Sequence, residues 1–297
     1  NLPVGNVFDW SPEIAKECGI PADFEPSEAE LLMIDHVEPR LSGEEVRQLQ
    51  AMGREGQDAL VDLVMERHKR VWNARNDPYR HGWNLPHWDP IKAALQTHDE
   101  IFVFGANDSA KTKFLARIAV HVLFRRIRWP GMAQGPVKVL CVAQNDNASK
   151  QIQQSAIYEE LPVEARRWND RKKKSRDVGM KLNYSVSDGF TGSGFVLGNP
   201  RGSQCFFRTV AQWRDGTLSF EGAAYHLVCI DESMPMSMLQ ALQFRAGKSG
   251  GKILFCFTSI NGFDSICKNV LTGATVEKSL PIQSVWLSLM LLFTIFW

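Results

Sequence analysis

The stretch IFVFGANDSAKT, residues 101–112, decides the fold of this chain. Its first four residues, IFVF at 101–104, are apolar and predict a buried strand. Residues 111–126 carry apolar side chains at helical spacing and predict a helix. Between the two lies GANDSAKT, residues 105–112. A strand, a turn of this kind and a helix predict a phosphate-binding loop, whose backbone N–H groups surround a phosphate at the positive end of a helix.

Each part of this loop has a predicted role. Lys111 would reach the β- and γ-phosphates of ATP, Thr112 would hold Mg²⁺ through its hydroxyl, and Gly105 permits the tight turn. The phosphates would be bound by Gly105, Ala106, Asn107, Asp108, Ser109, Ala110, Lys111 and Thr112. The motif G-x-x-x-x-G-K-[ST] has its second glycine at the position of Ala110 in this chain. If that position needs a positive φ, alanine is less stable there than glycine. The alternative for these eight residues alone is a chance strand, turn and helix.

A second signature lies at HLVCIDES, residues 226–233. An apolar strand there ends in two acids, of which Asp231 would coordinate Mg²⁺ and Glu232 would act as the general base on the attacking water. Strands often end in acids, so this motif is weak alone. Together with the phosphate loop, it predicts an ATPase that uses ATP and Mg²⁺, with Lys111 and Glu232 as catalytic residues.

A third strand, KILFCF at 252–257, runs into Thr258 and Ser259. Small hydroxyl side chains at this place can sense the γ-phosphate by hydrogen bonding. The alternative is a plain turn after a strand, with Gly262 providing the turn.

The remaining strands predict the architecture. VKVLCVA at 137–143, HLVCI at 226–230 and KILFCF at 252–257 show no polar alternation. Strands that are apolar on both faces are typical of a parallel sheet covered by helices. We therefore predict an α/β fold with a mostly parallel central sheet flanked by helices. Cys141, Cys229 and Cys256 lie inside these strands, where a free thiol packs as a small hydrophobe.

The flanks differ from this core in composition. Residues 1–35 hold eight acids and one Lys, a net charge of −7, so a chain of net charge +1 carries +1 − (−7) = +8 elsewhere. We predict an acidic and helical N-terminal region over 1–75 and an ATPase domain over 76–284. A capping box at Ser42 and Glu45 begins a predicted helix that extends to residue 74 and breaks near Gly53 or Gly56.

The last residues, VWLSLMLLFTIFW at 285–297, are apolar and uncharged. The run is shorter than the roughly 20 residues of a membrane helix, so no membrane association is expected. A chain truncated or frame-shifted near residue 284 is the preferred interpretation of this atypical tail.

The order and spacing of these motifs resemble the large terminase subunit of tailed bacteriophages, in its N-terminal ATPase portion. The resemblance covers residues 80–284. It is carried by GWNLPHWDPIKAAL (82–95), GANDSAKT (105–112), VKVLCVAQNDNASKQIQQSAIYEELP (137–162), GTLSFEGAAYHLVCIDES (216–233) and TSINGFD (258–264). By this resemblance, 82–95 is the adenine-contacting segment, with Pro86 and Trp88 as candidate contacts, and 258–264 is the coupling motif.

The resemblance implies a P-loop NTPase of the additional-strand, catalytic-glutamate class that pumps double-stranded viral DNA into a procapsid. Its implied partners are double-stranded DNA, a portal protein, a small terminase subunit and further copies of itself in a ring. It would act in the host cytoplasm, transiently docked on the procapsid portal. The family's nuclease domain would begin beyond residue 300, so no nuclease activity is expected here. A helicase-like DNA-dependent ATPase and a non-catalytic nucleotide-binding prophage remnant are the alternatives.

Two further features bear on this interpretation. Many family members have an arginine in the phosphate loop, whereas residues 106–110 hold none. A substitute would come from a neighbouring subunit or from Arg201, Arg208, Arg214 or Arg245. The run RRWNDRKKKSR at 166–176 has seven Lys or Arg in eleven residues, and its Arg171, Lys172, Lys173 and Lys174 are candidates for sequence-independent DNA contact. A solvated surface loop is the alternative for that run.

Overall fold

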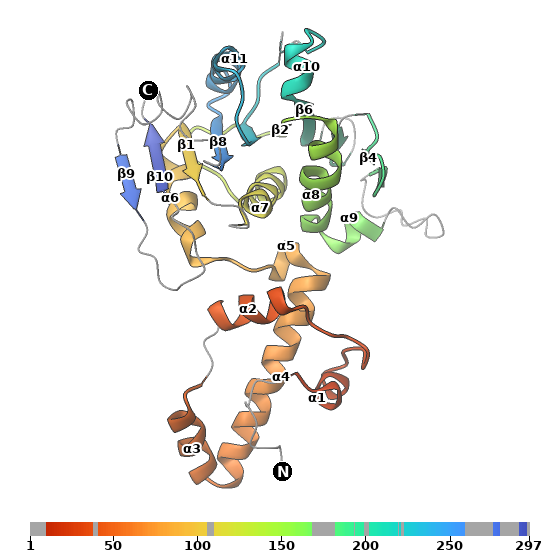
Figure 1. Ribbon diagram of the computed structural model, residues 1–297, viewed down its shortest axis with the longest axis vertical. Helices are drawn as coiled ribbons and strands as arrows, with labels where there is room; N and C mark the ends of the chain where they lie inside the picture. The colour runs from red at the N-terminus through yellow and green to blue at the C-terminus, as the bar shows by residue number, and fades with distance from the viewer. Residues whose placement is uncertain are drawn as a thin grey trace. The chain divides into compact units, whose positions relative to one another are not determined.

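The computed structural model describes residues 10–37, 41–105, 110–167, 182–192, 194–198, 202–218, 220, 223–258, 276–279 and 291–295 (Figure 1). The chain divides into two compact units, Asn1–Pro86 and His87–Trp297. This division falls after Pro86, whereas the sequence interpretation placed a boundary after residue 75. A long helix runs through residue 75 and ends at Asn76.

The first unit is helical. Its helices are α1 (Pro12–Glu17), α2 (Glu28–Val37), α3 (Gly43–Ala51), α4 (Arg54–Asn76) and α5 (Pro78–His81). The predicted capping box of Ser42 and Glu45 begins α3, and the predicted break lies at Gly53, whose φ of 71° suits glycine. Apolar side chains from α1, α2, α4 and the loop between α1 and α2 form its core, namely Ala15, Ile20, Phe24, Ile34 and Val71.

The second unit alternates helices with strands. A short helix, η1 (Pro86–Trp88), begins at the last residue of the first unit. The helices of the second unit are α6 (Asp89–Thr97), α7 (Lys111–Leu123), η2 (Ala148–Gln154), α8 (Ser155–Glu160), α9 (Val163–Arg167), α10 (Val210–Arg214) and α11 (Met236–Gly247). Its strands are β1 (Glu100–Phe104), β2 (Lys138–Ala143), β3 (Tyr184–Ser185), β4 (Gly189–Phe190), β5 (Gly194–Val196), β6 (Gln204–Thr209), β7 (Leu227–Asp231), β8 (Lys252–Phe257), β9 (Val276–Ser279) and β10 (Leu291–Ile295).

The main sheet has the order β5-β6-β2-β7-β8-β1-β10-β9. Its five central strands, from β6 to β1, are parallel to one another. The outer strands β5, β10 and β9 pair antiparallel. The prediction of a mostly parallel central sheet flanked by helices is therefore confirmed. The strand β8 lies between β1 and β7, and is hydrogen-bonded to both.

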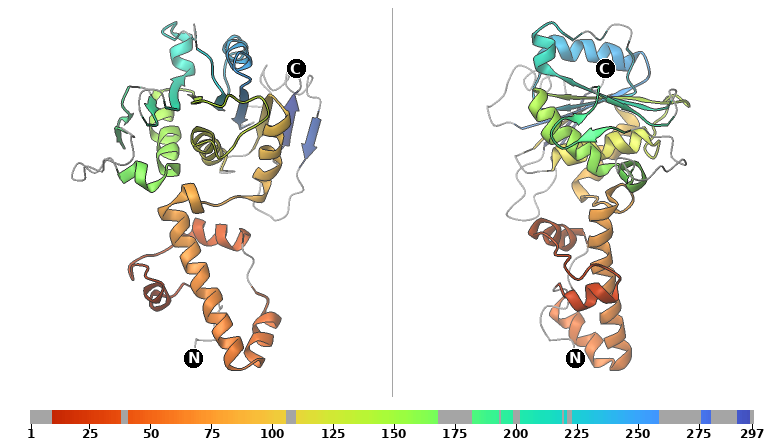
Figure 2. Two further views of the ribbon diagram at one scale, coloured as in Figure 1. Left: turned by 180° about the vertical axis from the view of Figure 1, so that it is seen from behind. Right: turned by 90° about the vertical axis from the view of Figure 1, so that its right-hand side faces the viewer.

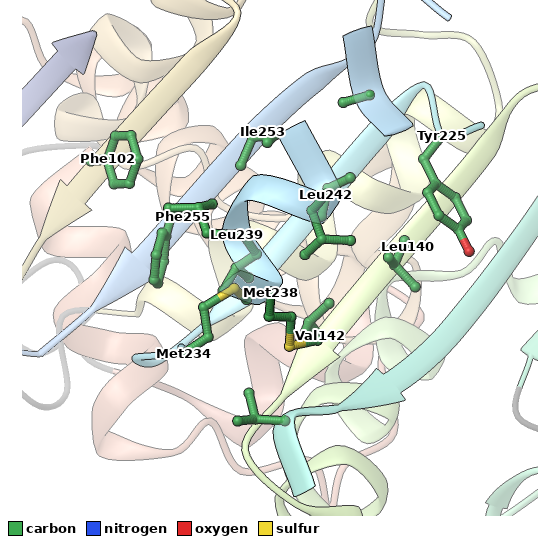
Figure 3. Packing of buried hydrophobic residues seen from close by; sticks show 14 of the residues in the cluster. Phe102, Leu140, Val142, Tyr225, Met234, Met238, Leu239, Leu242, Ile253 and Phe255 are labelled. Atoms are coloured by element: carbon green, nitrogen blue, oxygen red, sulfur yellow. The ribbon is translucent and has the colours of Figure 1, made fainter. Parts of the chain in front are cut away.

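Helices cover both faces of this sheet. Figure 2 shows α11 on one face and α7 with α8 on the other, and α7 contacts β2, β7 and β8. Under α11, aromatic and aliphatic side chains from β1, β2, β7 and β8 form the larger core cluster (Figure 3). Because side chains alternate along a strand, the neighbours of those core residues point to the α7 face.

Four buried cysteines lie on the α7 face, one from each of four adjacent strands: Cys205, Cys141, Cys229 and Cys256. The Sγ atoms of Cys141 and Cys205 are 4.0 Å apart, and the Sγ of Cys229 lies 4.0 Å from the carbonyl oxygen of Leu115 in α7. All four are free thiols, as predicted for the three that the sequence placed in strands. They pack as small apolar side chains beneath α7.

One helix differs from its expectation, and the apolar tail adds a strand to the sheet. The predicted helix over 148–160 begins as a π-helix, η2, and becomes α-helical only at Ser155. Part of the apolar tail forms β10, which pairs with β1, so residues 291–295 extend the sheet. Among the helices that the structure describes, none combines the length and apolarity that a membrane span needs.

Candidate nucleotide-binding site

The predicted site residues lie at the carboxyl ends of the parallel strands. Gly105 follows β1, Asp231 ends β7, and Thr258 follows β8. Parallel strands end at the same edge of a sheet, so these residues meet although they are far apart in the sequence. The edge of the sheet at β1, β8 and β7 is therefore the candidate site.

The most direct contact joins the two predicted motifs. The hydroxyl of Thr112, in the first turn of α7, donates a hydrogen bond to Oδ2 of Asp231 at 2.8 Å. Asp231 is on the α7 face because Cys229, two residues earlier on β7, contacts Leu115 of α7. The pKa of Asp231 is raised to about 6, because burial and the nearby Glu232 raise it more than the hydrogen bond from Thr112 and the charge of Lys111 lower it.

The predicted phosphate loop is tied to the sheet at its start. The backbone N–H of Gly105 donates to the carbonyl oxygen of Phe257 in β8 at 3.1 Å. The Lys111 side chain is buried, and its Nζ donates to the carbonyl oxygen of Gly105 at 3.0 Å. These bonds bring the two ends of the loop together. The loop interior, Ala106, Asn107, Asp108 and Ser109, lies outside the described residues.

Ala110, which replaces the second glycine of the phosphate-loop motif, has a left-handed backbone conformation. Ala110 precedes α7 with φ 56° and ψ 25°. An L-residue with a Cβ pays about 1–2 kcal/mol for this conformation, whereas glycine adopts it freely. The motif position therefore requires a positive φ here, and Ala110 meets that requirement at a cost in stability.

Ala110→Gly is expected to stabilise the second unit. Glycine relieves the left-handed strain, but it also has more conformational freedom in the unfolded chain, which opposes folding. The free energy of unfolding should therefore rise by about 0.5–1 kcal/mol. Thermal unfolding measures it as a rise in Tm. The matched control is Ala116→Gly in the right-handed interior of α7, which should lower Tm. A fall in Tm for Ala110→Gly would contradict the hypothesis that the backbone of Ala110 is strained.

The predicted general base is held from the neighbouring strand. Glu232 follows β7 with a positive φ of 73°, and its N–H donates to the carbonyl oxygen of Cys256 at 2.9 Å. Its carboxylate accepts the Thr258 hydroxyl at 3.0 Å and the Thr258 N–H at 3.4 Å. Non-glycine residues in this strained conformation concentrate at functional sites, where surrounding contacts maintain them. The end of β8 thus fixes both the start of the loop and the carboxylate of Glu232.

One residue at this edge was missed by the sequence interpretation. Gln144 follows β2, and its Nε2 donates to the carbonyl oxygen of Ser233, just beyond Glu232. Its own backbone oxygen accepts from the N–H of Ala211 in α10 at 3.1 Å. Gln144 therefore supports the turn that carries Glu232. The available signal was its position at the end of an apolar strand, the same position as Asp231 and Thr258.

The other predicted contacts fall elsewhere. Trp88 is 2% exposed and packs on Phe114 of α7, with ring centroids 5.3 Å apart, so its ring belongs to the core. Its adenine contact and that of Pro86 stay predictions. Ser259 and the basic residues Arg171, Lys172, Lys173 and Lys174 lie outside the described residues, as does Arg201.

Two of the described candidates for a completing arginine, Arg208 and Arg245, lie away from Asp231. Arg208 pairs with Val142, which belongs to the core cluster under α11, so it is on the opposite face of the sheet. Arg245 is in α11, and its carbonyl oxygen accepts the N–H of Tyr225, which precedes β7 at the other edge. Arg214 ends α10 and is exposed. Arg201, Arg214 and a neighbouring subunit therefore all stay open as sources.

The donor set fits a magnesium ion. Mg²⁺ prefers oxygen ligands and commonly takes one or two carboxylates together with substrate phosphates. Asp231 and the Thr112 hydroxyl supply such oxygens, and because burial raises the pKa of Asp231, its carboxylate would be stabilised by a bound cation. Among the described residues, no cluster of three or more His, Cys, Asp or Glu could hold a metal alone. Thr112 and Asp231 would thus hold the ion jointly with a phosphate ligand.

Comparison with known proteins gives a limited result. The chain is similar to the large terminase from a thermophilic bacteriophage, with a TM-score of 0.36 and 12% sequence identity. The match covers 58% of this chain and 36% of that chain, so it spans about a third of the terminase. No family model and no curated protein matches the sequence. At this level of similarity, the function has to be argued from the site itself.

Proposed function

We propose that this chain binds and hydrolyses ATP with Mg²⁺ at the edge formed by β1, β8 and β7. The observation that carries the proposal is the hydrogen bond between Thr112 and Asp231, which joins two motifs separated by more than a hundred residues. Lys111 precedes Thr112, and Glu232 follows Asp231. A lysine, a hydroxyl and two acids at one sheet edge are the groups that phosphoryl transfer to water requires.

The roles of these residues follow from their positions. Lys111 would leave the Gly105 carbonyl to bind the phosphates, and Thr112 and Asp231 would hold Mg²⁺. Bound Mg²⁺ supplies neutralising charge on the phosphate oxygens. Glu232 would accept a proton from the attacking water, with Thr258 positioning its carboxylate. The order of β1, β8 and β7, with one strand between the two motifs, supports the additional-strand, catalytic-glutamate class of P-loop NTPase.

The finer proposal is a DNA-packaging motor, the ATPase part of a terminase large subunit. It rests on the order of sequence motifs together with this sheet order. Its partners would be double-stranded DNA, a portal protein, a small terminase subunit and further copies of the chain in a ring, acting in the host cytoplasm at the procapsid. Two of the candidate arginines, Arg208 and Arg245, lie away from Asp231, which leaves a neighbour in a ring as one source of a completing arginine.

Lys111→Ala tests the ATPase proposal. Loss of the charge on the transferring phosphate is expected to reduce turnover about 10²–10³-fold. The measurement is phosphate release by the purified full chain, with and without duplex DNA. The matched control is Lys113→Ala, which removes an equal charge from the same helix at a side chain paired with Glu159. Equal ATPase activity of the two variants would contradict the proposed site. Stimulation of hydrolysis by duplex DNA would support a DNA motor over a DNA-independent ATPase.

A further inference from the structure

A strongly basic segment begins at the candidate nucleotide site and continues beyond it. Residues 111–145 contain seven Lys or Arg and no acid. Four of these cations follow the end of α7, namely Arg125, Arg126, Arg128 and Lys138. Together with Lys248, at the end of α11, we call them the basic edge. Both stretches of chain that carry it, 123–145 and 236–252, are fully described and contain no acidic residue.

The connection from α7 to β2 is held in one shape by its own side chains. Arg125 has a positive φ of 60°, and its guanidinium donates to the carbonyl oxygens of Gly135 and of Ala133, the latter at 2.7 Å. The Nε of Arg128 donates to the carbonyl oxygen of Arg125 at 3.0 Å. The connection is therefore an ordered turn that presents its cations at fixed positions.

A second turn lies against it. The indole Nε1 of Trp129 donates to the carbonyl oxygen of Gly250 at 2.9 Å. A Cβ built on Gly250 would lie only 3.3 Å from the carbonyl oxygen of Gly131. These contacts bring the turn after α11, with Lys248, beside the turn after α7. The cations of both turns thus share the edge of the sheet where β2, β7 and β8 begin.

The charges at this edge act on a neighbouring histidine. The N–H of Lys138 donates to Nδ1 of His226 at 2.9 Å. Burial lowers the pKa of His226, and the charges of Lys138 and Arg125 lower it further. A nearby carboxylate, Asp99, is already bonded to Lys252, with Nζ and Oδ1 2.9 Å apart. The two turns contain no acidic side chain of their own, so their Lys and Arg side chains keep a positive electrostatic potential at this edge.

We propose that the basic edge binds the phosphate backbone of double-stranded DNA. Exposed cations on two stretches of chain that themselves contain no acid suit a polyanion, and phosphate contact needs no sequence-reading side chain. The turn after α7 offers no exposed ring for stacking on unpaired bases, since Trp129 is only 5% exposed, whereas α11 exposes the ring of Phe244 beside Lys248. The choice of DNA as the polymer rests on the proposed function.

The position of this surface separates it from hydrolysis. Lys138 begins β2 and Lys252 begins β8, whereas Asp231 and Thr258 lie at the carboxyl ends of their strands. Strands of this length, at about 3.3 Å per residue, place the two edges roughly 15 Å apart. Removal of charge from the basic edge is therefore expected to leave DNA-independent ATP hydrolysis unchanged.

The test is a triple variant, Arg128→Gln with Lys138→Gln and Lys248→Gln, in the full chain. All three side chains are exposed, and glutamine keeps most of the aliphatic stem. The control triple, Arg47→Gln with Arg54→Gln and Lys69→Gln, removes the same charge from exposed positions of the first unit. Fluorescence anisotropy with a labelled duplex of mixed sequence, at several salt concentrations, gives affinity and salt slope, and Tm confirms folding.

The test triple is expected to bind the duplex about tenfold or more weakly and to reduce the salt slope by about 2–3, whereas the control keeps both values. Equal losses in the two triples, or an unchanged slope, would overturn the proposal. Stronger competition by polyglutamate than by unlabelled duplex would overturn it in favour of an acidic protein surface. Wild-type protein that hydrolyses ATP but does not bind the duplex would overturn this inference alone, and absence of hydrolysis would instead count against the proposed ATPase.

Discussion

Glu232→Gln is expected to reduce ATP turnover by about 10²–10⁴-fold while leaving nucleotide binding intact, because an amide cannot accept the proton of the attacking water. The fold around the substitution should persist. The Thr258 hydroxyl can still donate to the amide oxygen, and the backbone bond from residue 232 to the Cys256 carbonyl does not involve the side chain. The loss should therefore appear in kcat and not in the affinity for ATP.

Single-turnover hydrolysis and equilibrium binding of a fluorescent ATP analogue together measure this effect. Glu159→Gln, at an exposed carboxylate of α8, is the matched control and should behave as wild type. An equal loss of binding and turnover in Glu232→Gln would assign Glu232 a structural role and remove it as the general base.

Asp231→Asn should have opposite effects on activity and stability. Loss of a charged magnesium ligand should reduce hydrolysis strongly. The same change removes a part-buried charge, while the asparagine oxygen can still accept the Thr112 hydroxyl. A rise of the pKa from 3.8 to about 6 corresponds to about 3 kcal/mol of destabilisation by the charged form. The variant should therefore be more stable than wild type at neutral pH.

The pH dependence of this gain has a definite sign. A carboxyl with a raised pKa binds its proton more tightly in the folded state, so protonation favours folding. Protonation of Asp231 therefore adds its full contribution to the free energy of unfolding below pH 3.8. That contribution falls as the pH rises and is lost above about pH 6. The stability difference between Asp231→Asn and wild type should thus be small near pH 4 and largest above pH 7.

Tm measured across this pH range without Mg²⁺ checks the expectation. Adding Mg²⁺ with ATP should raise the Tm of wild type more than that of the variant, since a ligand that binds the folded state stabilises it. The control Asp146→Asn, at an exposed acid after β2, should show neither effect. A variant less stable than wild type at pH 7.5 would show that the Asp231 charge is compensated.

Much of the second unit could be predicted from apolar runs. The strands at 101–104, 137–143 and 252–257 are buried on both faces, and such runs are readable without tertiary information. The π-helix at 148–154 and the pairing of residues 291–295 with β1 were not predictable. Both depend on tertiary contacts, because a π-helix has no distinctive periodicity in a short segment and strand partners are set by the sheet.

The residue types of the candidate site could be predicted from the sequence motifs, whereas most of the contacts between these residues could not. Lys111, Thr112 and Asp231 follow a spacing pattern, and the structure brings Thr112 and Asp231 into hydrogen-bond contact. The link from Thr258 to Glu232 could not be derived, because it requires knowing that β8 lies beside β7. Trp88 illustrates the opposite case, since a tryptophan near a phosphate loop can contact a base or fill the core, and only packing on Phe114 reveals its burial.

The position of β8 also has a mechanical consequence. Five consecutive parallel strands share evenly spaced hydrogen bonds, so a force directed along the strands loads many of these bonds in shear at once. A force pulling an outer strand such as β5 sideways would break its bonds one after another. Because β8 is bonded on one side to the strand before Gly105 and on the other to the strand ending in Asp231, tension along the strand axis reaches both halves of the site together. The two halves can then bear load without separating from each other.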